Sequence, residues 1–290
     1  MTPIQVPLLR QNLAWFLRRP LSLGSLFVVF FYILIGLLAS FGLIGSDFAT
    51  THNNQAYLPP GDEFFFGSDF LGRSVLSRVI QGTRVSLLVG FFSASLSTFL
   101  GLFLGALAGY FSSWVDDLIV WLYTTIESIP YILLISAFSF SLGQGLSNLY
   151  IALGLTGWVK LCRLIRGEFL KHKNQEYVLA AQAIGASHFR RIFKHILPNV
   201  IHLGLIQFSL SFVLAIKLEV ILSYLGLGVE PGTPSWGTMI NDAKAELTRG
   251  VWWNLTAATA AMFLLILSVN ILTESIREFF DPKSQYTKSR

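Results

Sequence analysis

Long apolar runs without a single charge constrain this chain more than any other feature. The runs from Leu21 to Ile44 and from Val85 to Tyr110 contain no charged residue. A helix needs about 20 apolar residues to cross ~30 Å of hydrocarbon, so either run can span a membrane. Only 13% of the 290 residues are charged, whereas soluble domains carry about 25%. The chain is therefore predicted to be an all-α polytopic membrane protein.

The distribution of apolar runs predicts six transmembrane helices. Arg18 and Arg19 precede the first run, which is too long for a signal peptide and is expected to be retained, with the N-terminus in the cytoplasm. The expected organisation is a cytoplasmic segment 1–20, a first helix 21–45, an external segment 46–84, a five-helix core 85–275 and a cytoplasmic tail 276–290. The spans of that core are expected at about 85–110, 118–142, 149–165, 200–227 and 255–272.

Three glycines share one face of the second predicted span. Gly101, Gly105 and Gly109 recur every four residues, and small residues at this spacing let another helix approach closely. We interpret this face as a helix-packing surface and not as part of a pore.

The loop between the fourth and fifth spans, residues 171–198, contains the polar stretch "EYVLAAQAIGASHFRRIFKHILPNV". A helix from Glu176 to Ile192 would place Tyr177, Ala180, Ala181 and Ile184 on one face, and Pro198 is expected to end it and begin the next helix. A helix lying on lipid would need bulky Trp, Phe and Leu on its apolar face, whereas the residues from Leu179 to Ser187 are mostly alanine. The loop is basic, which favours the cytoplasm. We therefore predict a short cytoplasmic helix that docks against a partner protein.

This stretch resembles the EAA loop of ABC importer permeases, on the pattern formed by Ala180, Ala181, Gly185, Leu197 and Pro198. More narrowly, it resembles the second permease of the dipeptide/oligopeptide/nickel group. Two further stretches agree, "FGSDFLGRSVLSRVIQGTRVSL" and "LSYLGLGVEPGTPSWGTMI". The matches cover roughly residues 64–282. The resemblance implies the six-helix type I ABC importer permease fold in a bacterial cytoplasmic (inner) membrane.

The resemblance also implies a set of partners. In such importers the EAA helix is a coupling helix that sits in a cleft of a separate ATPase subunit. The implied assembly is a heterodimer with a second homologous permease, two ATPase subunits and an external substrate-binding protein. The residues expected to couple to the ATPase are Glu176, Tyr177, Ala180, Ala181, Gly185, Ala186, Ser187, Arg190 and Arg191.

The chain itself is not expected to be an enzyme. It has no G-x-x-x-x-G-K-[ST] phosphate loop, so ATP and Mg²⁺ would be bound by the ATPase subunits, and no cofactor or metal is expected on this chain. At two positions the chain departs from the family: Leu179 stands where the general pattern has Glu, and Gln182 where the group commonly has Arg. The second departure predicts that one docking salt bridge is missing.

Charges inside the spans are candidates for the translocation path. Burying a charge at mid-membrane costs at least about 2.5–3.5 kcal/mol, so such residues face protein or water. Glu127, which lies beside Pro130, and Glu219 can line the path and meet the amino group of a peptide. Alternatively they pair with neighbouring side chains, and the sequence leaves both interpretations open.

Three other functions fit these residues less well. A stand-alone secondary transporter or channel would be expected to show internal repeats, and none is evident between residues 1–145 and 146–290. An intramembrane enzyme would need a nucleophile with a base, or a metal motif, which the spans lack. The net charge of +5 is attributed to basic cytoplasmic loops and not to nucleic-acid binding. Dipeptides, oligopeptides, nickel chelates and antimicrobial peptides all stay open as cargo.

Overall fold

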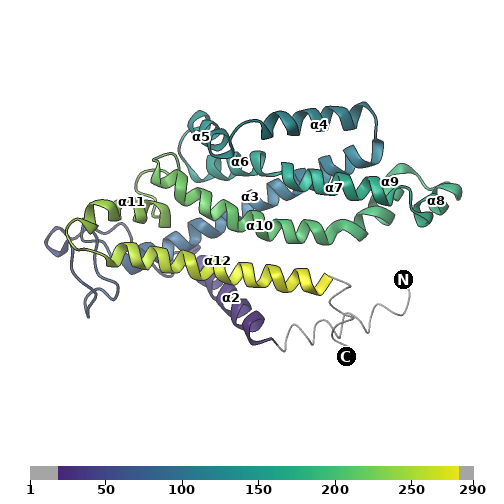
Figure 1. The fold of residues 1–290 in the computed structure, drawn as a ribbon. Helices are drawn as coiled ribbons and strands as arrows, with labels where there is room; N and C mark the ends of the chain where they lie inside the picture. The colour runs from purple at the N-terminus through teal and green to yellow at the C-terminus, as the bar shows by residue number, and fades with distance from the viewer. Residues whose placement is uncertain (1–18, 281–290) are drawn as a thin grey trace. The chain divides into compact units, whose positions relative to one another are not determined.

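The computed structural model describes residues 19–280, and their regular elements are helices (Figure 1). Ser68 and Ser74 add an isolated β-bridge. The elements are α2 (Pro20–Ser40), η1 (Asn53–Gln55), α3 (Val75–Phe111), α4 (Trp114–Glu127), α5 (Tyr131–Leu142), α6 (Leu146–Gly157), α7 (Val159–His172), α8 (Glu176–Ala183), α9 (His188–Arg190), the π-helical η2 (Arg191–Ile196), α10 (Leu197–Tyr224), α11 (Trp236–Leu247) and α12 (Trp253–Phe280). Nearly all of the expected segment 1–20, and residues 281–290 of the expected tail 276–290, lie outside the described residues.

The number of spans differs from the six predicted. Four helices in the described chain are long and apolar enough to cross a membrane: α2, α3, the continuous helix His188–Tyr224, and α12. The predicted third span is the pair α4 and α5, bent by 92°, which raises the count to five if the pair is one span. Pro130 causes this break, because proline has no N–H and disfavours helix in the residue before it. The predicted fourth span is divided between α6 and the charged α7, so it fails as a single apolar helix.

Two predicted boundaries also move. α3 begins at Val75, so the helix includes residues 75–84, which we expected to precede the second span as part of the external segment 46–84. Pro198 does not end a helix, because the chain from His188 to Tyr224 is one continuous helix. A proline ring clashes with the carbonyl four residues earlier in an ordinary α-helix. The wider π-helical turn η2 directly before α10 accommodates that ring without a break.

The chain divides into two compact units, residues 89–215 and the remainder, and the boundaries fall within α3 and α10. In the unit that contains both termini, α2 packs along α12. The Tyr32 hydroxyl on α2 donates to the carbonyl oxygen of Ala261 at 2.8 Å, and the hydroxyls of Ser22 and Ser275 lie 2.8 Å apart. These hydrogen bonds fix the register of the two spans.

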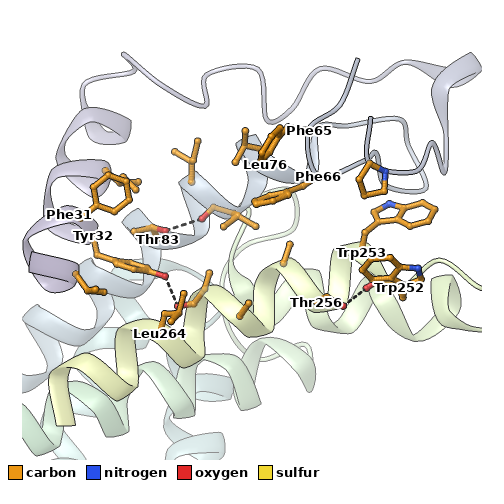
Figure 2. A pocket seen from close by; sticks show the side chains of 18 residues that line it. Phe31, Tyr32, Phe65, Phe66, Leu76, Thr83, Trp252, Trp253, Thr256 and Leu264 are labelled. Atoms are coloured by element: carbon orange, nitrogen blue, oxygen red, sulfur yellow. Dashed lines mark hydrogen bonds between the residues drawn. The ribbon is translucent and has the colours of Figure 1, made fainter. Parts of the chain in front are cut away.

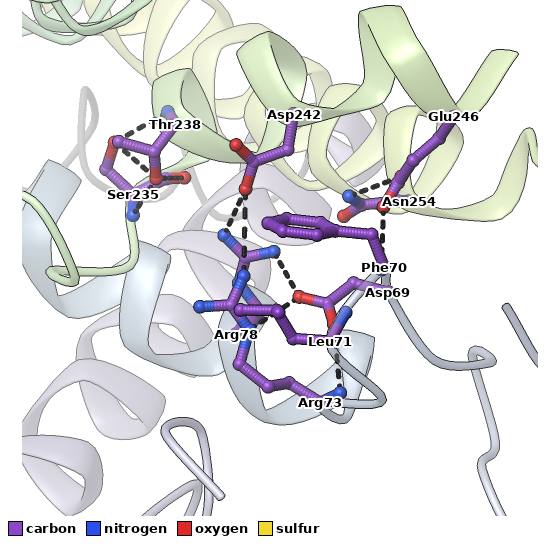
Figure 3. A network of polar contacts seen from close by, with 10 residues as sticks. All are labelled: Asp69, Phe70, Leu71, Arg73, Arg78, Ser235, Thr238, Asp242, Glu246 and Asn254. Carbon is purple, nitrogen blue, oxygen red and sulfur yellow. Dashed lines mark hydrogen bonds and ion pairs between the residues drawn. The ribbon is translucent and has the colours of Figure 1, made fainter. Parts of the chain in front are cut away.

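A buried ion network organises the segment before α3 in the same unit (Figure 3). The Asp69 carboxylate is fully buried and accepts from Arg73 Nε and from Arg78 Nη1, each at 2.7 Å. Arg78 also donates to Asp242 on α11 at 2.8 Å. On the next turn of α11, Glu246 accepts from the Phe70 backbone N–H at 3.1 Å. Carboxylates and guanidinium groups therefore compensate one another where loop, α3 and α11 meet.

The unit of residues 89–215 is built on close contact between α3 and α7. A Cβ added at Gly101 would lie 2.7 Å from the Leu161 side chain, and one at Gly105 would lie 2.6 Å from the Cys162 carbonyl. At Gly109 it would lie 2.5 Å from Phe169 Cβ. The three glycines thus lie where α7 approaches the α3 backbone too closely for a side chain.

Candidate functional site

The 176–193 segment consists of α8, α9 and the start of η2, and two of its side chains anchor it. Val178 is 1% exposed and Ala181 4%. Val178 belongs to a buried apolar cluster with Phe169 of α7 and with Ile192 and Ile196 of η2. The predicted docking face is therefore partly wrong. Positions 178 and 181, three residues apart, face inward, whereas Tyr177, Ala180 and Ile184 are exposed.

A glycine turn ends α8. Gly185 has φ +82°, and its N–H bonds the carbonyl of Gln182 at 2.9 Å, while the Ala186 N–H bonds the Ala181 carbonyl at 3.0 Å. These two bonds form a Schellman motif, in which the left-handed residue is usually glycine. Ser187 then caps α9 by accepting from the Arg190 N–H. The turn reverses the chain within four residues, and a Cβ at Gly185 would meet nothing within 4 Å.

Polar side chains cross-link the two arms of this turn. Arg191 donates to Gln182 Oε1 at 2.6 Å and lies 3.1 Å from His188 Nδ1, and its guanidinium lies 5.7 Å from the centre of the Tyr110 ring. The Tyr110 hydroxyl is itself 2.9 Å from His188 Nδ1. Gln182, which we expected to lack a docking salt bridge, thus serves inside the segment as an acceptor for Arg191.

A second polar contact ties α8 to its neighbours. The Tyr177 hydroxyl lies 2.8 Å from His172 Nδ1 and accepts from Asn199 Nδ2 at 3.4 Å. Partial burial raises the pKa of Tyr177, against the opposing effect of the hydrogen bond from Asn199. Glu176 lies in the first turn of α8, where a carboxylate interacts favourably with the helix dipole.

Large apolar side chains remain exposed on this segment, and we call them the apolar patch: Leu179, Ile184, Phe189 and Phe193. Ile184 is 87% exposed, and Phe189 is 70% exposed. The Phe189 and Phe193 rings lie 4.4 Å apart. Our sequence analysis missed Leu179, Phe189 and Phe193 because it read the stretch as mainly alanine. Exposed apolar side chains rimmed by polar residues are typical of protein–protein or membrane interaction sites.

The predicted path residues Glu127 and Pro130 lie at the break between α4 and α5. Glu127 is the last residue of α4, Pro130 directly precedes α5, and the Glu127 carboxylate forms an ion pair with Arg163 of α7. The Arg163 guanidinium also lies 5.1 Å from the centre of the Tyr123 ring. A second ion pair joins the same two helices at the first turn of α4, where Arg166, one turn beyond Arg163 on α7, donates to Asp116.

Glu219 lies in the other unit and is completely buried. One carboxylate oxygen accepts from the Ser223 hydroxyl at 2.8 Å. The second oxygen, Oε2, has no hydrogen-bond partner among the described residues. Glu219 is therefore enclosed by protein in this conformation.

Comparison with known proteins places these features in a family. The family model of the binding-protein-dependent transport system inner membrane component matches residues 101–286. The dipeptide transport system permease protein DppC of Bacillus subtilis is 34% identical over 266 residues, which cover 92% of this chain and 83% of that protein. The oligopeptide transport system permease protein OppC of the same organism is 35% identical over 87% of this chain and 83% of its own length. The di/tripeptide permease protein DppC of Pseudomonas aeruginosa is 37% identical over 76% of this chain and 72% of its own length.

These relatives are permease subunits, and the matched residues include the 176–193 segment and the spans on both sides of it. The expectation that the chain is a transport subunit and not an enzyme is confirmed, and the stand-alone transporter is not favoured. The described residues contain no group of three His, Cys, Asp or Glu side chains that could hold a metal ion. The chain belongs to the binding-protein-dependent transport system inner membrane component family, as a multi-pass inner-membrane permease subunit of an ABC importer of the DppC/OppC type.

Proposed function

We propose that this permease imports peptides and that its 176–193 segment is the coupling element, which docks into a cleft of a partner ATPase subunit. The observation that carries the docking role is Ile184, 87% exposed at the tip of the turn. The cations Arg190, Arg191 and Lys194 lie within ten residues of Ile184 in the chain, so this tip is unsuited to the hydrocarbon core. A cleft in a protein partner would cover its exposed apolar side chains.

Anchoring and exposure within one short segment support a mechanical role. Val178 and Ala181 are packed into the buried cluster that includes α7 and η2, while Ile184 and Phe189 project from the turn. A force applied to the exposed residues would therefore be transmitted to the helix His188–Tyr224, which continues without a break into the membrane. In this mechanism the coupling residues are those predicted from the sequence, together with the apolar patch.

The proposed assembly contains a second, homologous permease, two ATPase subunits that bind ATP and Mg²⁺, and an external substrate-binding protein. Both termini would lie in the cytoplasm, on the side of the 176–193 segment. The relatives are named as dipeptide, oligopeptide and di/tripeptide permeases, which supports a peptide as cargo.

The break at residues 128–130 is the proposed contribution to the translocation path. Irregular backbone at membrane depth is tolerated only where it is buried in protein or lines a water-filled cavity. Glu127 and Pro130 flank this irregular backbone, and Arg163 balances the Glu127 charge. Glu219 would line the translocation path only in a conformation in which the surrounding helices separate and expose its carboxylate.

The docking proposal is tested by purifying the assembled importer in mild detergent and comparing Ile184→Asp with Ile184→Leu. Because Ile184 makes few contacts within the chain, the aspartate variant should fold normally, yet it would bury an unpaired charge on docking. We expect it to lose ATPase subunits and transport-coupled ATP hydrolysis, whereas the leucine variant keeps both. Normal ATPase capture by a folded Ile184→Asp variant would overturn the docking role of this segment.

Cargo is tested separately, with the assembled importer in vesicles. Uptake of labelled dipeptides and longer peptides is measured with the cognate binding protein present, and Glu127→Gln is compared with wild type. Failure to transport any peptide while ATPase coupling persists would refute the peptide assignment alone.

A further inference from the structure

An apolar groove lies between α2, α3 and α12, at the end of these helices where the loop before α3 lies (Figure 2). Its volume is about 870 Å³, and α2, α3, α12 and the loop around Pro60 and Phe66 line it. Nothing in the described fold fills this space, although it is as large as many ligand sites.

Four of the polar side chains that line the groove already donate to backbone carbonyls. The hydroxyls of Tyr32, Thr83 and Thr256 donate to the backbone carbonyls of Ala261, Val79 and Trp252 at 2.8, 3.0 and 2.9 Å, as Figure 2 shows. The Trp253 indole N–H donates to the Ser68 carbonyl at 2.9 Å. These groups have little to offer a polar ligand, and an apolar site of this kind stays dry unless an apolar molecule fills it.

The groove opens onto the exposed sides of two helices that are long and apolar enough to cross a membrane. Phe31 of α2, 50% exposed, and Leu264 of α12, 48% exposed, both line it. Along α12 the lining runs from Trp253 to Leu264, about 16 Å at 1.5 Å per residue. Half of a ~30 Å hydrocarbon core is about 15 Å, so the groove has the depth of one leaflet.

Charges of both signs lie next to the lining residues in the sequence. Asp62 and Glu63 lie exposed between the lining residues Pro60 and Phe65, and the Glu63 carboxylate also accepts from the Gln55 side-chain amide. Arg249 lies three residues before Trp252, with its guanidinium 5.1 Å from the centre of the Tyr57 ring. An ammonium group complements the carboxylates, and a phosphate complements the guanidinium. A zwitterionic phospholipid headgroup supplies both the ammonium and the phosphate.

We propose that this groove is a specific site for one membrane phospholipid, whose acyl chain fills the space between α2, α3 and α12 and whose zwitterionic headgroup lies beside Asp62, Glu63 and Arg249. The lipid would link the loop before α3 to the spans, and it would do so independently of cargo and of ATPase docking.

The test uses the complete importer, purified in detergent and analysed for retained phospholipid by native mass spectrometry. Ala260 lines the groove, whereas its neighbour Thr259 does not, and both are exposed on α12. Ala260→Phe should lower the occupancy of retained lipid about tenfold, which corresponds to about 1.4 kcal/mol, while Thr259→Phe should leave it unchanged. Equal retention by the two variants, or no retained lipid in wild type, would overturn the proposal.

A photoreactive phenylalanine analogue in place of Phe31, which already lines the groove with a ring of similar size, identifies the occupant without filling the space. In membranes that contain phosphatidylethanolamine and phosphatidylglycerol, we expect cross-links to phospholipid, with phosphatidylethanolamine enriched over its share of the membrane. The same analogue in place of Phe30, which is exposed on α2 and does not line the groove, should label the two lipids in proportion to their abundance. Cross-links at position 31 to the second permease or to the binding protein would show that a protein side chain fills the groove, and would refute the lipid site.

Discussion

The side-chain oxygen of Gln182 accepts a hydrogen bond of 2.6 Å from the guanidinium of Arg191, across the turn that Gly185 makes possible. The contact joins the end of α8 to the start of η2, so it holds the two arms of the docking turn together. The glutamine that departs from the family pattern thus has a role within the chain itself.

Replacing Gln182 should change the order of this turn according to charge. Gln182→Arg would place two guanidinium groups together, and we expect faster backbone hydrogen exchange over residues 176–191. Gln182→Glu would keep an acceptor and add an ion pair, so exchange should be as slow as in wild type. The loss of one such exposed bond is worth about 0.5–1.5 kcal/mol. Identical exchange in both variants would contradict a bracing role for the pair.

The contact between α3 and α7 predicts opposite effects for two glycine-to-alanine changes. Gly109→Ala would push a methyl group to 2.5 Å from Phe169 Cβ and 2.6 Å from the Arg166 carbonyl, and overpacking of this kind costs about 1–3 kcal/mol. At Gly167 on α7 nothing lies within 4 Å, so Gly167→Ala should be neutral or stabilise the helix by up to about 1 kcal/mol. Thermal unfolding in detergent measures the stability of both variants. A destabilised Gly167→Ala variant together with an unaffected Gly109→Ala variant would contradict the close contact between α3 and α7.

The ion network in Figure 3 predicts a rank order of stability. Asp69 is 0% exposed and holds both Arg73 and Arg78, so Asp69→Asn leaves the two guanidinium groups to share the single carboxylate of Asp242, at a cost of about 3–5 kcal/mol. The Asp242 side chain is 24% exposed, so water can replace part of its contribution. We expect Asp242→Asn to lower the unfolding temperature less than Asp69→Asn does. Equal effects would mean that the two carboxylates are equivalent.

Glu246 predicts a pH dependence of stability. Burial raises the pKa of Glu246, against the opposing effects of hydrogen bonds from Asn254 and the Phe70 N–H. Asp69 raises this pKa further and Arg78 lowers it. A raised folded pKa means that the stability from this group is fully present below its unfolded pKa of about 4.3 and is lost as pH rises through the folded value.

Glu246→Gln should remove this pH-dependent contribution to stability, because glutamine does not titrate. The Gln oxygen can accept from the Phe70 N–H. If the Asn254 side-chain amide flips, the Gln amide can donate to Asn254 Oδ1, which has no hydrogen-bond partner among the described residues. Unfolding temperatures of the two proteins are compared at about pH 4 and about pH 8. The unfolding temperature of the variant, relative to that of wild type, should increase as pH rises. An increase toward low pH instead would show that the pKa of Glu246 is not raised by folding.

The amino-acid sequence by itself determined the class of fold and the family. Apolar runs such as Leu21–Ile44 and Val85–Tyr110 are long enough to require a membrane whatever the packing, and the pattern of Ala180, Ala181, Gly185 and Pro198 is local enough to be recognised without coordinates. The glycine spacing on α3 likewise indicated a close approach, since three positions four residues apart share a helix face in any environment.

Tertiary structure decided which helix approaches those glycines, which face of α8 is buried and where the spans break. Val178 is buried and Ile184 exposed because α7 and η2 cover one side of α8, and neither helix can be located from the sequence of α8 alone. The same holds for the ion network, in which Asp242 reaches Arg78 from 164 residues away in the chain. Burial and charge compensation depend on such non-local neighbours, whereas membrane insertion and turn formation depend on local composition.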